Sequence, residues 1–228
     1  MQEAVASGVG LGISVDTGTT CFAACEEAKR LGLNLIITDH HLPDKHLPKA
    51  FALLNPARED CGFSERKLCG TGVAFFLLMA VWQCLRRLGE PPGYDLRLLL
   101  DRVAVATVAD MMDLVGVNRI LVAYGLQQLN HSPCVGMSAL MKVARVRGKV
   151  TVETIGFYIA PRINAAGRMQ HGDVAMRFLL SSDMEEANAL ANQLDEMNKH
   201  RRNIEIKVLQ QATNLLGEKK QNNGLMVY

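Results

Sequence analysis

Two aspartates and a pair of histidines are the first residues in this sequence whose types and spacing suggest chemistry. Asp16 and Asp39 each directly follow a short apolar run, and His40 and His41 come immediately after Asp39. In an open parallel sheet, ligands collect at the carboxyl ends of strands, and neighbouring strands lie about 4.8 Å apart. The two strand ends can therefore share one site. Carboxylate oxygens and imidazole nitrogens together suit Mn²⁺, Zn²⁺ or Fe²⁺.

Each of these residues also has a structural interpretation. Asp16 has the right type and place to cap the helix expected after it, and Asp39 to form a turn. For adjacent histidines after a strand of apolar residues, a metal-binding or catalytic role is the favoured interpretation.

A third aspartate, Asp110, closes the almost wholly apolar segment 102–109, which we expect to be helical. The helix dipole disfavours a carboxylate near a helix C-terminus, so another group should compensate for its charge. A bound cation would do so. The alternative is an exposed terminal carboxylate.

The segment 161–168 combines arginines with small residues. Arg162, Asn164 and Arg168 stand among alanines and a glycine, and a guanidinium fork matches the oxygens of a phosphate group. The segment therefore predicts phosphate binding, with ordinary surface arginines as the alternative. His171 belongs either to the same loop or to the general surface, and we favour the surface.

Basic residues cluster twice more, and either cluster could follow a nucleic-acid backbone. The second cluster is interleaved with acids, which favours a solvated helix face. The clusters are Lys142, Arg145, Arg147 and Lys149, and then Lys199, His200, Arg201 and Arg202.

Composition excludes several classes of protein. With 49% hydrophobic and 21% charged residues the chain can bury a core, which argues against disorder. The longest apolar stretch, 73–82, is shorter than the roughly 20 residues that cross a bilayer. We therefore expect no membrane association and a cytoplasmic location. The six cysteines form no CxxC pair, so we expect reduced thiols and no zinc cluster.

The elements that must position these residues begin with a parallel sheet. Apolar runs predict strands at Gly12 to Val15, Leu33 to Thr38 and Ala52 to Leu54, with a helix at Cys21 to Leu31 as the first crossover. Helices dominate beyond the sheet. They are expected at 72–88, which looks buried, and at 94–109, 118–129, 137–145 and 152–159.

The last predicted element, from Met184 to about Gly217, is longer than the usual globular helix. A spacer between two domains, or two helices with a break near His200, fits this length better than a single core helix.

Several motifs, taken together, resemble one family. In chain order they lie at 15–18, 38–43, 54–56, 70–74, 107–110, 118–119 and 161–168. They resemble the RecJ-like exonucleases of the DHH phosphoesterase superfamily, which is named for the tripeptide found here at 39–41. The resemblance covers nearly the whole chain. It implies an α/β fold with an open parallel sheet, followed by a helical region and a long connecting helix.

The resemblance implies a 5′→3′ exonuclease that hydrolyses single-stranded DNA in recombination and repair, using two Mn²⁺ or Mg²⁺ ions. By the same resemblance Asp16 would bridge the two metals, while His40 and Asp110 would hold one of them. His41 would contact the scissile phosphate, and Asp39 would orient the histidines.

The resemblance also implies which residues bind the substrate phosphates and which partners the protein has. Arg168, Asn164 and Arg162 would support the phosphate-binding network. Other DNA-repair proteins are expected partners of a full-length form that is a monomer.

The chain departs from the family pattern at both ends. The family's Asp-x-Asp motif, which supplies ligands to both metals, is absent, and the glycine-rich second domain would only begin near Tyr228. We therefore expect a partial catalytic domain at 1–182, a connecting helix at 183–217 and the first strand of a second domain at 218–228. The isolated chain should have little or no activity.

Two other functions stay open at this point. One is a DHH-like module that binds DNA or a partner without catalysis, although the presence of all three of Asp16, His40 and Asp110 argues against it. The other is a DHH phosphodiesterase acting on short oligonucleotides or cyclic dinucleotides, which the segment 161–168 and the long helix disfavour.

Overall fold

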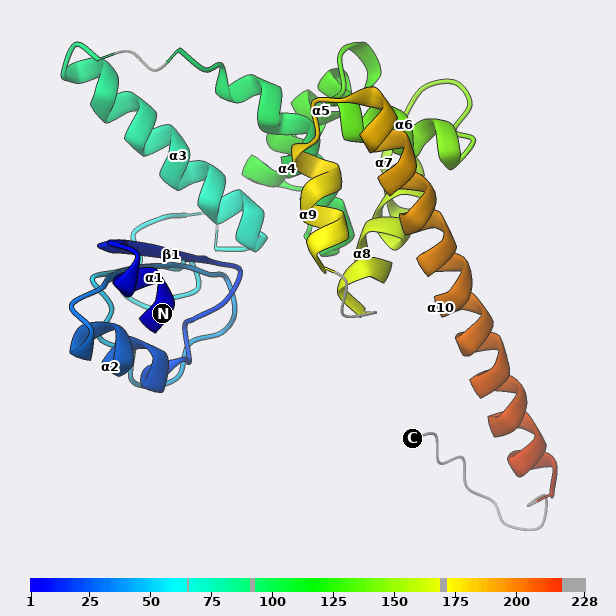
Figure 1. The fold of residues 1–228 in the computed structure, drawn as a ribbon, viewed down its shortest axis with the longest axis horizontal. Helices are drawn as coiled ribbons and strands as arrows, with labels where there is room; N and C mark the ends of the chain where they lie inside the picture. The colour runs from blue at the N-terminus through cyan, green and yellow to red at the C-terminus, as the bar shows by residue number, and fades with distance from the viewer. Residues whose placement is uncertain (65, 91–92, 169–171, 219–228) are drawn as a thin grey trace. The chain divides into compact units, whose positions relative to one another are not determined.

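A computed structural model describes residues 1–64, 66–90, 93–168 and 172–218 (Figure 1). The chain forms two compact units. The first, here called the sheet unit, comprises Met1–Ser132 and Val150–Gly156; the second, the helical unit, comprises Pro133–Lys149 and Phe157–Tyr228. The predicted terminal strand and His171 lie outside the described residues. The functional domain boundaries expected from the sequence differ from these units and stay a prediction.

The predicted parallel sheet is confirmed. It has three strands in the order β1 (Leu11–Val15), β2 (Asn34–Thr38) and β3 (Ala52–Leu54), and both pairings are parallel. Helix α2 (Phe22–Arg30) makes the crossover from β1 to β2, after the short N-terminal helix α1 (Gln2–Ala6). The open parallel sheet with helices is the fold class that the sequence predicted.

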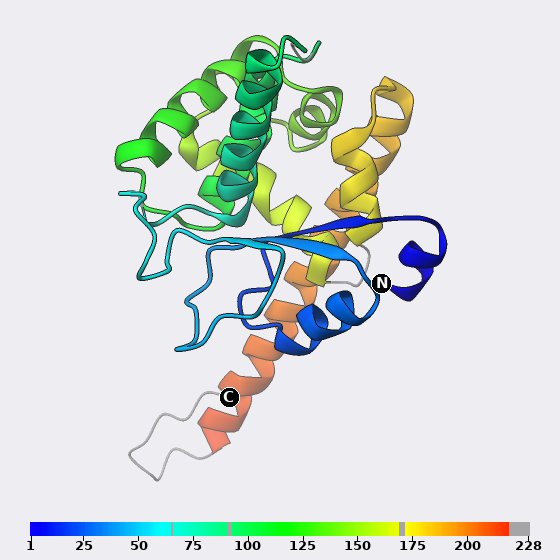
Figure 2. The same ribbon diagram turned by 90° about the vertical axis from the view of Figure 1, so that its left-hand side faces the viewer.

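Two helices cover the sheet. Helix α2 lies on one face and the first turns of α3 (Gly70–Arg87) lie on the other (Figures 1 and 2). The prediction that α3 is buried is wrong for its later turns, where Leu78 and Val81 are 45% and 46% exposed. The cause is that α3 is apolar on more than one face, while its packing partners cover only part of its surface.

The rest of the sheet unit is helical. It contains the 3₁₀ turn η1 (Leu96–Leu99), α4 (Leu100–Ala109), α5 (Gly116–His131) and α7 (Val152–Thr154). A core formed by Phe75, Val103 and Leu121 joins α3, α4 and α5.

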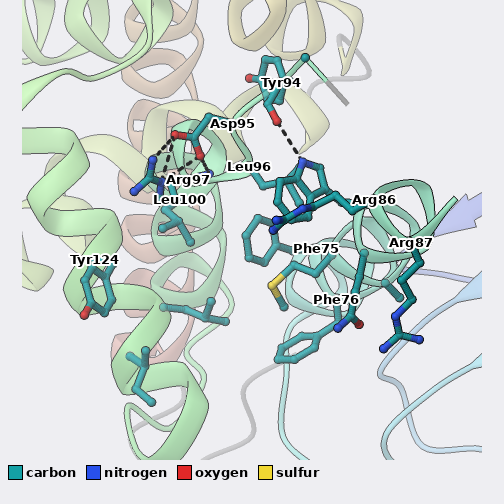
Figure 3. A pocket seen from close by; sticks show the side chains of 17 residues that line it. Phe75, Phe76, Arg86, Arg87, Tyr94, Asp95, Leu96, Arg97, Leu100 and Tyr124 are labelled. Atoms are coloured by element: carbon teal, nitrogen blue, oxygen red, sulfur yellow. Dashed lines mark hydrogen bonds and ion pairs between the residues drawn. The ribbon is translucent and has the colours of Figure 1, made fainter. Parts of the chain in front are cut away.

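Beside this core is an open, largely apolar pocket of about 1390 Å³ (Figure 3). On its rim the indole N–H of Trp82 donates to the carbonyl of Tyr94, at 3.2 Å. The guanidinium of Arg86 lies 4.8 Å from the centre of the same indole ring.

The helical unit contains α6 (Val135–Val143), α8 (Ala160–Arg168), α9 (Gly172–Leu180) and α10 (Met184–Glu218). A π-helical turn, η2 (Ile155–Ile159), leads into α8. The segment 161–168, expected to be a loop, is therefore helical. Pro161 is the second residue of α8 and directly follows the π-helical turn, a local distortion of the kind at which helices accommodate a proline.

Helix α10 is continuous, so the break considered near His200 is absent from it. Its first half is buried through Ala187, Ala191 and Leu194 and packs on α6, α8 and α9. Its second half, from 203 to 214, is largely exposed. The helix is thus a core helix at one end and an extension at the other. Among the described residues, none of the helices has the length and apolarity needed to cross a bilayer.

A helix contact generates a stability prediction. A Cβ on Gly125 of α5 would overlap the carbonyl oxygen of Leu100 and the Cβ of Ala104 on α4. Gly125→Ala should therefore lower the free energy of unfolding by about 1–3 kcal/mol. The matched control is Gly167→Ala in α8, where a Cβ meets open space. That change should stay within about 1 kcal/mol and favour stability. Urea unfolding of both variants would measure the difference, and equal midpoints would contradict the close packing.

Candidate metal centre

The sheet register positions the first three polar residues of the site. Val15, Thr38 and Leu54 lie side by side at the carboxyl ends of the strands, so the next residues are Asp16, Asp39 and Asn55. The backbone N–H of Asp16 donates to the carbonyl of Thr38 at 2.9 Å, and that of Asp39 to the carbonyl of Leu54 at 3.0 Å. The hydrogen-bond ladder thus continues into the site residues and holds them at one edge of the sheet.

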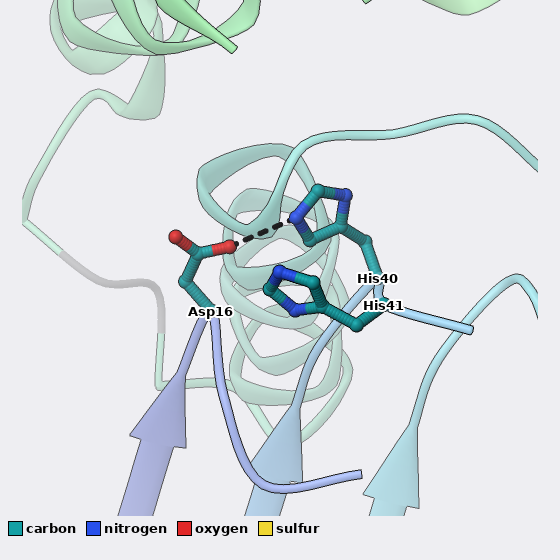
Figure 4. A group of neighbouring side chains, drawn as sticks. All are labelled: Asp16, His40 and His41. Carbon is teal, nitrogen blue, oxygen red and sulfur yellow. Dashed lines mark ion pairs between the residues drawn. The ribbon is translucent and has the colours of Figure 1, made fainter. Parts of the chain in front are cut away.

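The predicted metal ligands meet at this edge. His40 Nε2 lies 3.0 Å from Asp16 Oδ1 and 3.6 Å from Asp110 Oδ2. Ligand atoms of Asp16, His40 and His41 all lie within 4.8 Å of one another (Figure 4). Neighbouring ligands about 2.1 Å from an octahedral ion are roughly 3 Å apart. The spacing and the donor set, carboxylate oxygen with imidazole nitrogen, therefore fit a divalent cation.

Asp16 is held in a conformation unusual for a residue with a side chain. Its φ is +65°, in the left-handed region, which costs about 1 kcal/mol or more outside glycine. Gly70, the first residue of α3, leaves the space that the Asp16 carboxylate occupies, because a Cβ on Gly70 would overlap Asp16 Oδ1. The alternative role of Asp16 as a helix cap is not seen, since no side chain caps α2 and its N-cap position is Cys21.

Asp110 is the C-cap residue of α4, the location that the sequence identified as unfavourable for a carboxylate. Burial raises the pKa of Asp110, His40 opposes that shift, and the nearby Asp16 carboxylate adds to it. The raised pKa means that ionising Asp110 costs more here than it does in water. A bound cation would stabilise that form, in agreement with the expectation for this residue.

Asp39 is 2% exposed and accepts hydrogen bonds from its surroundings. The N–H of Thr19 donates to Oδ2 at 2.8 Å, the N–H of His40 donates to Oδ1 at 2.8 Å, and His41 Nδ1 lies 2.7 Å from Oδ1. Burial raises the pKa of Asp39, but these hydrogen bonds outweigh it, so the pKa lies well below its usual range. The hydrogen bond between Asp39 and the His41 ring raises the pKa of His41. Asp39 therefore orients His41 through Nδ1.

Asn55 is a positioning residue to which the sequence assigned no role. Its amide NH₂ donates to Thr19 Oγ1 at 2.9 Å and to the carbonyl of His41 at 2.8 Å, and its Oδ1 accepts from the N–H of Ala57 at 2.8 Å. Asn55 thus ties the loop after β1 to the loop after β2. Its place directly after β3 is the signal that could have identified it.

The predicted phosphate-binding residues belong to the helical unit and not to the cluster above. Arg162 Nε donates to Asp195 Oδ1 at 2.8 Å, and Nη1 donates to the carbonyl of Tyr158 at 2.7 Å, so its guanidinium holds α8 against α10. Asn164 is exposed on α8. The backbone of Arg168 ends α8, but its side chain lies outside the described part of the structure. Phosphate binding by these residues stays a prediction.

Comparison with known proteins identifies relatives of the chain. Residues 5–107 match the family described as "DHH family, N-terminal domain". The chain is 39% identical over 225 residues to the single-stranded-DNA-specific exonuclease RecJ of Dickeya dadantii, and 40% identical over 212 residues to that of Escherichia coli. These alignments cover 94% and 90% of the chain but 38% and 37% of the relatives. The chain therefore spans well under half of their length.

Solved structures agree with these sequence matches. A crystal structure of exonuclease RecJ bound to manganese aligns with a TM-score of 0.78 at 35% identity, covering 96% of this chain and 54% of that one. RecJ from Thermus thermophilus in complex with Mn²⁺ aligns with a TM-score of 0.77 at 36% identity, covering 92% of this chain and 31% of that one. The resemblance expected from the motifs is confirmed.

The contact between Gly70 and Asp16 gives a prediction for metal binding. Gly70→Ala should displace the Asp16 carboxylate and weaken Mn²⁺ binding by roughly 10- to 100-fold, as loss of a supporting contact does at metal sites. Gly72→Ala is the matched control, because a Cβ there makes only ordinary contacts of 3.5 Å or more. Isothermal titration with Mn²⁺ would compare the two. Equal affinities would show that Gly70 does not position Asp16.

The buried carboxylate gives a second prediction. Asp39→Asn replaces an acceptor oxygen by an NH₂ group facing N–H donors, so the free energy of unfolding should fall by about 1–3 kcal/mol. The control is Asp113→Asn, an exposed carboxylate paired with Lys67 at 2.7 Å, which should change little because water solvates both partners. Urea unfolding without metal would separate the two variants. An unchanged midpoint for Asp39→Asn would exclude a structural role for the buried charge.

Proposed function

We propose that this chain, which carries a DHH-family N-terminal domain over residues 5–107, is the catalytic part of a metal-dependent exonuclease that hydrolyses phosphodiester bonds of single-stranded DNA in the 5′→3′ direction. The observation that carries the proposal is the meeting of Asp16, His40 and Asp110 at one edge of the sheet. Relatives that share the family are named as exonucleases specific for single-stranded DNA, and solved relatives bind Mn²⁺ or Mg²⁺.

In this proposal Asp16, His40 and Asp110 hold a divalent cation, either Mn²⁺ or Mg²⁺. When bound, such an ion neutralises charge that builds on phosphate oxygens and lowers the pKa of water. His41 contacts the scissile phosphate. Its side chain is 62% exposed, and the hydrogen bond to Asp39 favours the protonated ring, which can donate to an anion. Asp39 is a positioning residue, because its buried oxygens are already occupied by protein donors.

Several finer expectations belong to the same proposal. The proximity of Asp16, His40 and Asp110 supports a site for one cation. A second metal ion bridged by Asp16 is proposed from the family resemblance alone. DNA-repair proteins as partners, a monomeric full-length form and little activity of the isolated chain also stay predictions.

The function can be tested with the chain in excess over its substrate, so that slow turnover is detectable. With Mn²⁺ and a 5′-phosphorylated single strand, we expect mononucleotide release from the 5′ end. Asp110→Asn should slow it by roughly 100-fold or more, because it removes a ligand. Asp113→Asn is the control, since its carboxylate belongs to an exposed ion pair.

Two results would overturn the proposal. Binding of the strand by a chain that shows no Mn²⁺ binding, or whose Mn²⁺ affinity is unchanged by Asp110→Asn, would indicate the non-catalytic module. Faster hydrolysis of cyclic dinucleotides or very short oligonucleotides than of long strands would indicate the phosphodiesterase.

A further inference from the structure

The helical unit contains an open polar groove of about 820 Å³, lined by residues from the C-terminal end of α6, from α8 and from the first half of α10. Here it is called the basic groove. Lys142, Arg145, Arg162, Lys199 and Arg202 line it as cations, with Asn188, Asn192 and Asn198 as neutral polar residues. None of its lining side chains is aromatic.

The groove arises because two basic segments far apart in the sequence come together. On α10 the lining positions 188, 192, 195, 199 and 202 are three or four residues apart and so lie on one face of the helix. The end of α6 packs against that helix and brings Lys142 and Arg145 to the same place. Two residues of the second cluster, Lys199 and Arg202, therefore line one wall of the groove. Arg201 instead pairs with Glu205, as the interpretation of a solvated helix face expected.

The charge of the groove is positive after internal pairing. Asp195 is the acidic residue among the lining residues, and Arg162 Nε and Lys199 Nζ lie 2.8 and 2.9 Å from its two oxygens. Burial raises the pKa of Asp195, but the two cations outweigh it and the net pKa is lowered, so the carboxylate is charged and already paired. Lys142, Arg145 and Arg202 are exposed, and within the described residues no carboxylate pairs with them.

The backbone of Arg145 is a second, independent reason to assign a role to the groove, because it lies in the left-handed region. Helix α6 ends in a Schellman motif, in which the N–H of Val146 donates to the carbonyl of Met141 at 2.9 Å and that of Arg145 to the carbonyl of Lys142 at 3.1 Å. The residue after the C-cap in this motif is usually glycine, yet Arg145 occupies it with φ +55°. A side chain kept at a strained backbone position indicates a function for that side chain.

We propose that the basic groove binds the phosphate backbone of single-stranded DNA. Exposed cations and asparagine side chains contact phosphate and sugar oxygens, and such contacts are independent of base sequence. Because the lining has no aromatic rings, it offers the bases no stacking surface. The choice of DNA as the polyanion rests on the proposed function. The groove itself does not depend on the metal centre.

Fluorescence anisotropy of a labelled oligothymidylate with the full 228-residue chain would test this. Measurements in EDTA at increasing salt make binding independent of the metal centre. Arg145→Gly should weaken binding roughly three- to tenfold at low salt and reduce the salt slope by about 0.7. Because glycine suits the left-handed position, its melting temperature should be unchanged or higher. Lys142→Ala combined with Arg202→Ala is a second variant that leaves the Schellman turn intact.

The matched control is Arg147→Gly. Arg147 is an exposed cation two residues further along the same segment and outside the groove lining. The control substitution therefore removes the same charge from the same segment without changing the groove. Its binding should stay within twofold of the unaltered chain, since a cation that contacts no phosphate releases no counterion from the DNA. Equal weakening by Arg145→Gly and Arg147→Gly, or no binding of the oligothymidylate by the unaltered chain at low salt, would overturn the inference. A failure of the unaltered chain to bind Mn²⁺ would overturn the proposed function and leave the groove result standing.

Discussion

The parallel register of the three strands is the constraint on which the site depends. It aligns Val15, Thr38 and Leu54, and the residues that follow them receive their positions from the same hydrogen-bond ladder. A slip of one residue would turn each of these side chains to the opposite face of the sheet. Asp39 can be buried at this edge because backbone donors from both neighbouring loops reach it. Its charge thus fixes the loops, and the loops in turn fix the histidines.

Two carboxylates converge on His40 at places that are unfavourable for their charge or their backbone. Asp16 and Asp110 approach one histidine nitrogen from a strand end and from a helix C-terminus. Neither place is favourable for a side-chain carboxylate, since one demands a left-handed backbone and the other opposes the helix dipole. The divalent cation proposed for this site would balance the negative groups that the fold brings together there. Here local strain and charge repulsion are therefore signs of function, not defects of packing.

Much of this could be predicted from the sequence, and the failures have physical reasons. The three strands are short apolar runs ending in polar residues, a strong local signal. Pro161 and the length of α10 misled the prediction. A proline accommodated beside a π-helical turn and a long helix packed at only one end both look like interruptions in a linear pattern. The apolar residues of α3 predicted burial, but burial depends on partners that periodicity does not reveal. Asn55 and Gly70 act through contacts across the fold, and no spacing in the sequence shows such contacts.

The left-handed residues have a consequence for engineering. Asp16, Met111 and Arg145 are the residues other than glycine with positive φ in the described part of the chain. A procedure that optimises thermal stability alone would select glycine at these places, because glycine relieves the backbone at no steric cost. It would thereby erase a proposed metal ligand, alter the turn beside Asp110 and remove a cation from the basic groove. For this fold, the most stable sequence and the most useful one are different sequences.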